Sequence, residues 1–149
     1  MPTTQPLIFL TDDDRDDLTM FQEALLEIDS NIRFKGFENG VELMERLLKV
    51  DEELPNAIYL DLNMPLMNGE ECVDDIRAEA RFNEIPIIIY SSYVDELKMD
   101  IIQKKGANLY LVKPSSFDNL KSALRKSLGY VQTVDKAELK AFEFVIVDE

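Results

Sequence analysis

The fold is decided by residues 57–69, which read Ala57-Ile58-Tyr59-Leu60-Asp61-Leu62-Asn63-Met64-Pro65-Leu66-Met67-Asn68-Gly69. The first four residues form an apolar run rich in β-formers, which predicts a strand buried on both faces. A single carboxylate, Asp61, ends the run, and Pro65 with Asn68-Gly69 predicts a loop directly after it. Ligands of open parallel sheets bind outside the carboxyl ends of the strands, so Asp61 is expected at a functional edge.

Three other apolar runs also end in polar side chains. Leu7–Thr11 is followed by Asp12-Asp13-Asp14, Ile87–Tyr90 by Ser91-Ser92, and Leu109–Val112 by Lys113-Pro114. Each polar residue alone has an ordinary explanation as a turn residue or a solvated charge, and Asp16 and Asp17 are expected to be solvated charges. The coincidence of four strand ends predicts instead that their side chains share one pocket.

Helical patterns between these runs complete a (βα)₅ alternation. Apolar residues repeat at helical spacing in residues 18–28 and 41–48, and a third helix is predicted to begin at Gly69. Further helices are predicted over 94–105 and 117–128, ended by Gly106 and Gly129, and a further strand over 32–37. Strands that alternate with helices imply an α/β doubly wound fold, with a parallel sheet covered on both faces.

Composition limits the function classes. At 149 residues with 46% apolar content, the chain is long enough for one domain with a substantial core. A formal charge of −14 argues against direct binding to nucleic acid. No apolar run of membrane-spanning length is found, and residues 1–4 show no signal-peptide pattern, so neither feature is expected. The single cysteine, Cys72, argues for a reducing compartment and is expected to be a core side chain, so a cytoplasmic protein is predicted.

The predicted pocket favours a particular chemistry. The carboxylates of Asp12, Asp13 and Asp61 would repel one another, and a cation would neutralise them. With no His and one Cys in the chain, an all-oxygen site for Mg²⁺ is favoured over zinc or copper. Mg²⁺ commonly binds one or two carboxylates plus phosphate oxygens, which leaves a carboxylate free as nucleophile, with Lys113 and Ser91 holding the other phosphoryl oxygens.

These residues resemble the receiver domain of two-component response regulators, over about residues 6–128. The resemblance rests on Asp12-Asp13, the loop Asp61-x-x-Met64-Pro65-x-Met67-x-Gly69, Ser91, Tyr110 and Lys113-Pro114. It implies a flavodoxin-like fold with strand order 2-1-3-4-5 and a stand-alone phosphoacceptor domain. Asp14 and Arg15 depart from the family's frequent residues, as do Ser91 and Ser92, but no required group is missing.

The resemblance also assigns roles to the site. Asp61 is implied to be the phosphoacceptor, and the metal ligands are implied to be Asp13 directly, Asp12 largely through water, Asp61, and the backbone carbonyl of Asn63. These roles predict a Mg²⁺-dependent phosphoryl transfer onto Asp61.

The remaining implied roles concern the response to phosphorylation. Ser91 resembles the switch hydroxyl, Lys113 the ion-pair partner of the phosphoryl group, and Tyr110 the aromatic that rotates inward behind Ser91. The surface of the fourth helix and fifth strand is then the expected partner site. A cis peptide between Lys113 and Pro114 is also implied.

The partners implied are a sensor histidine kinase or histidine phosphotransfer protein as donor, and a downstream target protein. The chain contains no His, so donor and onward acceptor are other molecules. Two alternatives are a phosphatase of the haloacid-dehalogenase type, which would have an acid where Asn63 stands, and a receiver-like binding module that never accepts phosphate.

The resemblance divides the chain into a receiver domain, 1–128, and a C-terminal extension, 129–149. The extension contains a capping-box pattern at 135–138 and a strand-like segment at 142–147. A parallel sixth strand beyond the fifth would need a left-handed crossover, so the segment is predicted to run antiparallel, reach the far edge of the sheet, or pair with another chain. Pairing that forms a homodimer is favoured slightly over irregular packing on its own domain.

Overall fold

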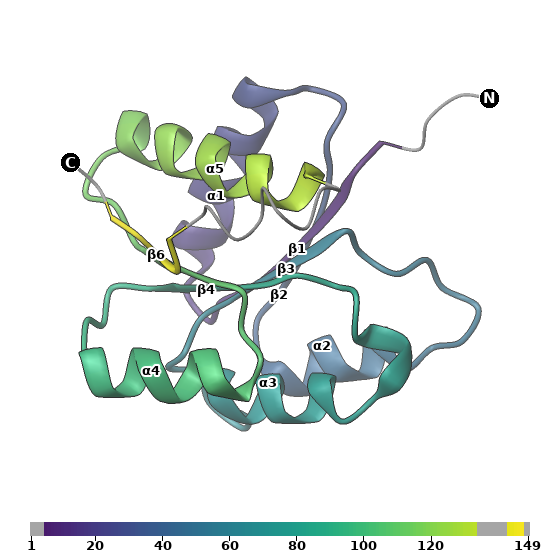
Figure 1. Cartoon of the computed structure of the whole chain (residues 1–149). Coiled ribbons are helices and arrows are strands. Elements are labelled where there is room, and N and C mark those ends of the chain that lie inside the picture. Colours follow the sequence, from purple (N-terminus) through teal and green to yellow (C-terminus); the bar gives the residue numbers. More distant parts are fainter. Residues whose placement is uncertain (1–4, 134–142, 148–149) are drawn as a thin grey trace.

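In the residues that the structure describes, a six-stranded parallel sheet lies between two layers of helices (Figure 1). The computed structural model describes residues 5–133 and 143–147. The strands are β1 (Leu7–Thr11), β2 (Arg33–Phe37), β3 (Ala57–Leu60), β4 (Ile87–Ser91), β5 (Leu109–Val112) and β6 (Val145–Ile146). The helices are α1 (Arg15–Ile28), α2 (Gly40–Leu47), α3 (Gly69–Arg77), α4 (Glu96–Lys105) and α5 (Phe117–Gln132), with a short 3₁₀ turn at Ala80–Phe82.

The strands pair in the order β2-β1-β3-β4-β5-β6, and all pairs are parallel. Helices α1 and α5 cover one face of the sheet, and α2, α3 and α4 cover the other (Figure 1). The predicted doubly wound α/β fold and the order of its first five strands are therefore confirmed. In the described residues, no helix has the length and apolar character needed to cross a bilayer.

Successive residues of the central strands serve the two faces of the sheet in turn. In β1, Phe9 packs in the core beneath α2, α3 and α4, whereas Ile8 and Leu10 pack in the core beneath α1 and α5. Strands β3 and β4 are buried along their whole length. A strand with no solvent face gains from apolar residues at every position, which is why these runs do not alternate with polar residues. Cys72 lies in the α2–α4 core, where burial raises the pKa of its thiol to about 12.

Each helix begins with a side chain that caps it in the loop leaving a strand. The caps of α1 to α5 are, in order, Asp14, Asn39, Asn68, Asp95 and Ser116, and each accepts one or two main-chain N–H groups of its helix. Such caps typically stabilise a helix by about 1 kcal/mol. They also fix the point where each helix starts, and so hold the loops at the carboxyl edge of the sheet.

Two helix boundaries differ from the prediction. Helix α5 continues through Gly129, where an end was predicted, because Tyr130 and Val131 pack against the core beneath α1 and α5. That packing outweighs the roughly 1 kcal/mol that a glycine costs in a helix. Helix α4 begins two residues later than predicted, after its cap Asp95, and ends as predicted at Gly106, which has a φ of 120°.

The prediction that a parallel sixth strand is disfavoured was wrong. Strand β6 pairs in parallel with β5 of its own chain, with Tyr110 beside Val145 and Leu111 beside Ile146. The handedness rule describes a helix packed as the crossover between two full strands. Here α5 packs against α1, and residues 133–144 separate α5 from β6. A strand of only two residues has too little twist to favour one handedness of the connection between β5 and β6. The predicted capping box at 135–138 lies outside the described residues.

The peptide bond between Lys113 and Pro114 is trans, so the expected cis bond was also wrong. The trans form of an X-Pro bond is the more stable one by about 0.5–1 kcal/mol. The main-chain N–H of Lys113 donates to the carbonyl of Ser91 at 2.9 Å, which continues the pairing of β4 and β5 to the edge of the sheet.

Candidate functional site

The carboxyl ends of β1, β3, β4 and β5 place the predicted site residues along one edge of the sheet. Thr11 lies beside Leu60 in the β1–β3 pair, and the N–H of Asp61 donates to the Thr11 carbonyl at 2.9 Å. Asp12 and Asp61 therefore leave the sheet at the same level. The backbone register supports the expectation that these strand ends share one pocket.

The acidic residues form a compact cluster. Carboxylate oxygens of Asp12, Asp13 and Asp61 all lie within 4.8 Å of one another. Asp12 and Asp61 are buried, while Asp13 is exposed. Three carboxylates at this separation form an oxygen donor set that fits a hard divalent cation.

The loop after Asp61 is held close to the start of α3. A Cβ added to Gly69 would lie 2.3 Å from the carbonyl oxygen of Asp61, so only glycine permits this approach. The N–H of Gly69 donates to the Leu62 carbonyl at 3.0 Å. Asn63 lies exposed in the same loop and its main-chain N–H donates to the Asp61 carboxylate. The loop is thereby tied to the carboxylate that it follows.

The ammonium group of Lys113 reaches into the acidic cluster. Its Nζ lies 2.9 Å from Asp12 Oδ2 and 2.7 Å from Asp17 Oδ2, and 3.9 Å from Asp61 Oδ2. Asp17 was predicted to be a solvated charge, and that was wrong. Its contact depends on how the first turn of α1 sits above the end of β5, which no local pattern of the sequence reveals.

Burial and crowding shift the ionisation of this cluster. Burial is the largest cause for Asp61, followed by the charge of Asp12, and its pKa rises to about 7 despite the opposing effect of Lys113. Burial also raises the pKa of Asp12. Burial would lower the pKa of Lys113, but its hydrogen bonds to Asp12 and Asp17 outweigh this and raise that pKa. A cation bound among these carboxylates would favour their ionised forms.

Ser91 and Tyr110 both contact one loop residue. The side-chain oxygen of Ser91 accepts the main-chain N–H of Tyr93 at 3.1 Å, and the hydroxyl of Tyr110 donates to the Tyr93 carbonyl. Ser91 and Tyr110 are almost fully buried. The loop that leads from β4 to α4 is thus attached to both predicted switch residues.

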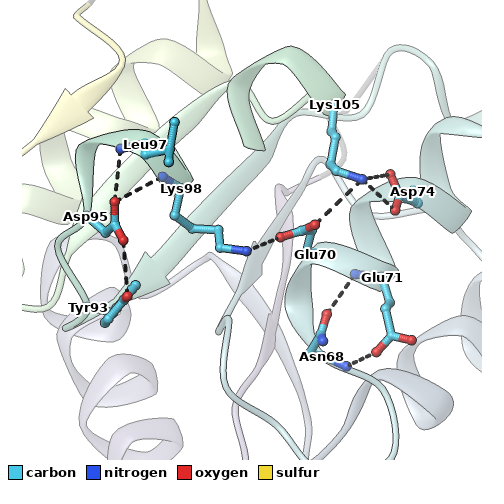
Figure 2. Close-up of polar contacts among 9 residues, drawn as sticks. All are labelled: Asn68, Glu70, Glu71, Asp74, Tyr93, Asp95, Leu97, Lys98 and Lys105. Atoms are coloured by element: carbon cyan, nitrogen blue, oxygen red, sulfur yellow. Dashed lines mark hydrogen bonds and ion pairs between the residues drawn. The ribbon is translucent and has the colours of Figure 1, made fainter. Parts of the chain in front are cut away.

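Helix α4, which follows this loop, is tied to α3 by ion pairs (Figure 2). Lys98 Nζ lies 2.7 Å from Glu70 Oε1, and Lys105 contacts both Glu70 and Asp74. The cap Asp95 also accepts a hydrogen bond from the Tyr93 hydroxyl at 3.2 Å. A shift of the β4–α4 loop would therefore strain contacts at the start of α4.

Comparison with known proteins identifies the family. The model of the response regulator receiver domain matches residues 8–125. The transcriptional regulatory protein PrrA of Mycobacterium tuberculosis is 35% identical over 115 residues, which cover 74% of this chain and 45% of PrrA. Chemotaxis protein CheY1 of Helicobacter pylori is 38% identical over 93 residues, which cover 62% of this chain and 73% of CheY1. The chain thus spans less than half the length of PrrA.

Solved structures share the fold. The phosphorylated cyanobacterial phytochrome response regulator RcpA matches with a TM-score of 0.80 at 23% identity, over 89% of this chain and 97% of RcpA. The Mn²⁺-bound form of response regulator Rcp1 matches with a TM-score of 0.77 at 23% identity, over 87% of this chain and 97% of Rcp1. With the family model spanning most of the sequence, the chain belongs to the response regulator receiver domain family.

Proposed function

We propose that Asp61 accepts a phosphoryl group from a phosphohistidine on a partner protein, in a two-component or phosphorelay pathway. The observation that carries the proposal is a buried strand-end carboxylate flanked by two further carboxylates and an ammonium group. A carboxylate oxygen of Asp61 forms a bond to phosphorus while the bond from phosphorus to the partner's imidazole nitrogen breaks, which leaves an acyl phosphate.

The residues around Asp61 have distinct proposed roles. Asp12, Asp13, Asp61 and the Asn63 carbonyl would hold Mg²⁺, which supplies positive charge next to the phosphoryl oxygens. Lys113 places its ammonium group close enough to pair with a phosphoryl oxygen on Asp61.

Ser91 turns its hydroxyl toward the phosphoryl group and Tyr110 transmits that movement. The shared attachment to the β4–α4 loop supports this coupling. The surface of α4 and β5 is then the part of the protein that a downstream target recognises. The only chemistry proposed is the chain's own phosphorylation and dephosphorylation, rather than turnover of an outside substrate.

The division into a receiver domain, 1–128, and an extension, 129–149, also belongs to this proposal. The pairing of β6 with β5 in one chain supports an extension that completes the receiver's own sheet. A homodimer through the tail would require β6 to exchange between two copies, which sedimentation over a range of concentrations would detect. Placement in the cytoplasm remains a prediction from the single, buried cysteine.

The test is incubation with acetyl phosphate and Mg²⁺, followed by mass spectrometry of the intact protein. Wild-type protein should gain one phosphoryl group, and Asp61→Asn should gain none, because an amide is a far poorer nucleophile. Sustained hydrolysis of phosphomonoesters would indicate a phosphatase instead. An inert wild-type protein would indicate a binding module and would overturn the proposal.

A further inference from the structure

The ammonium group of Lys113 has three N–H donors and three carboxylates around it. Hydrogen bonds to Asp17 at 2.7 Å and Asp12 at 2.9 Å use two of the donors. The nearest oxygen of Asp61 is 3.9 Å away, beyond hydrogen-bond distance but within reach of a small movement. Because Asp17 and Asp12 each hold one N–H group of Lys113, the third N–H group remains for an acceptor near Asp61.

Asp17 differs from the other carboxylate that holds Lys113. Asp12 belongs to the acidic cluster that fits a cation, and Asp17 lies outside it, on the first turn of α1. The cap Asp14 accepts the N–H groups of Asp16 and Asp17, so the main chain at Asp17 is fixed. Any cation held by the cluster competes with Lys113 for Asp12, and Asp17 is then the carboxylate that remains dedicated to Lys113.

A third group limits where the ammonium can lie. Nζ of Lys113 is 5.2 Å from the centre of the buried Tyr90 ring, within the range of a cation–π contact. Fixing a lysine side chain in one conformation costs up to about 2 kcal/mol of rotamer entropy, so contacts with neighbouring residues must offset this cost. Asp17 and Tyr90, neither of which belongs to the acidic cluster, supply these contacts.

We propose that Asp17 is a positioning residue for phosphoryl transfer, which holds the Lys113 ammonium so that its remaining N–H faces the phosphoryl oxygens at Asp61. The inference rests on the proposed phosphoacceptor function. With acetyl phosphate, the Asp61 oxygen forms the new bond to phosphorus, the bond from phosphorus to the acetyl oxygen breaks, and acetate leaves. Lys113 offsets charge on the transferred group only if it is already in place.

The test measures the rate of phosphorylation by acetyl phosphate at saturating Mg²⁺. Asp17→Asn keeps the shape of the side chain and removes its charge, and should slow the reaction about tenfold, the change that about 1.4 kcal/mol produces. Asp16→Asn is the matched control, since it removes the same charge from the same turn at an exposed position, and it should react at nearly the wild-type rate. Asp17→Glu, which keeps the carboxylate, should recover part of the loss.

Two further measurements separate positioning from a structural or metal-binding role. Mg²⁺ affinity should be the same in Asp17→Asn and Asp16→Asn. In a Lys113→Met background, Asp17→Asn should cause no further slowing, because the group that it positions is gone.

Each result has a definite meaning. An Asp17→Asn protein that reacts as fast as Asp16→Asn, or faster, overturns the inference, and so does equal slowing in both Lys113 backgrounds. If wild type and Asp16→Asn take up no phosphoryl group at all, the proposed function fails instead. Loss of fold in Asp17→Asn would appear in thermal unfolding, and Asp17→Glu and the double variant would then decide the inference.

Discussion

The hydroxyl of Tyr110 donates a hydrogen bond to the main-chain carbonyl of Tyr93, and Ser91 accepts the N–H of that same residue. If the Ser91 hydroxyl turns toward a phosphoryl group on Asp61, it must loosen its contact with Tyr93. The main-chain carbonyl of Tyr93 then keeps its hydrogen bond from Tyr110, and the Tyr93 hydroxyl keeps its hydrogen bond to the cap Asp95. One loop residue therefore links both predicted switch side chains to α4.

Ser91→Ala should weaken the response of this loop to phosphorylation. The variant has no hydroxyl to move, so hydrogen exchange at residues 92–95 should change less on phosphorylation than in wild type. Ser92→Ala is the matched control, because Ser92 is exposed and adjacent. Identical changes in Ser91→Ala and wild type would show that the coupling does not run through Ser91.

Tyr110→Phe should make the loop between β4 and α4 more mobile without leaving a cavity in the core. The ring remains and the hydrogen bond from the hydroxyl to Tyr93 is lost, which typically costs about 0.5–1.5 kcal/mol of the free energy of unfolding. Chemical denaturation would measure that loss, and exchange at 92–95 should become faster. Unchanged exchange would mean that the hydroxyl does not restrain the loop.

Asp13→Asn should weaken Mg²⁺ binding at least tenfold, because it replaces an anionic ligand with a neutral one in a site that depends on charge. Asp16→Asn removes the same charge nearby and should change the affinity far less. Equilibrium titration of both variants with Mg²⁺ measures the difference. Equal affinities in the two variants would remove Asp13 from the metal site.

The metal-free protein should lose stability as the pH rises toward about 7. The pKa of Asp61 is raised from about 4 to about 7, so between these values the folded state binds more protons than the unfolded state. Its contribution to stability is complete below pH 4 and is lost as the pH rises through 7. Mg²⁺ should reverse this trend and release protons when it binds near neutral pH, which calorimetry in buffers of different ionisation enthalpy would detect.

Strand β6 should contribute measurably to stability although it is short. Ile146 is buried between β5 and the core beneath α1 and α5, so Ile146→Ala should lower the free energy of unfolding by about 2 kcal/mol, near the lower end for such changes. Val147, the next residue, is about half exposed, and Val147→Ala should change the free energy of unfolding by less than about 0.5 kcal/mol. Equal effects would show that β6 does not hold to β5 in solution.

The parts of this fold that follow from local pattern were predictable. A strand buried on both faces requires a continuous apolar run, and a ligand-binding edge requires polar residues after it, so Asp61, Asp12 and Lys113 stand out in the sequence itself. The start of α3 at Gly69 and the end of α4 at Gly106 depend on a few adjacent residues and were predicted in the same way.

The parts that depend on tertiary contacts were missed. The continuation of α5 past Gly129 depends on packing of the residues beyond it, and the role of Asp17 depends on a partner 96 residues away. The place of β6 depends on whether the free energy gained by pairing a short segment with the edge of β5 outweighs the usual preference for right-handed crossovers. None of these is encoded in a window of neighbouring residues.

The edges of the sheet bear on how the protein behaves at high concentration. An open parallel sheet offers unpaired main-chain groups at both sides, and other chains can add to them as new strands. On one side the N–H of Tyr110 is already engaged by the Phe144 carbonyl at 2.8 Å, and the outermost strand is only two residues long. On the other side β2 exposes Lys35 and Gly36, a charge and a weak strand former. Both sides therefore oppose the growth of the sheet into intermolecular aggregates, and one of them does so with the chain's own last strand.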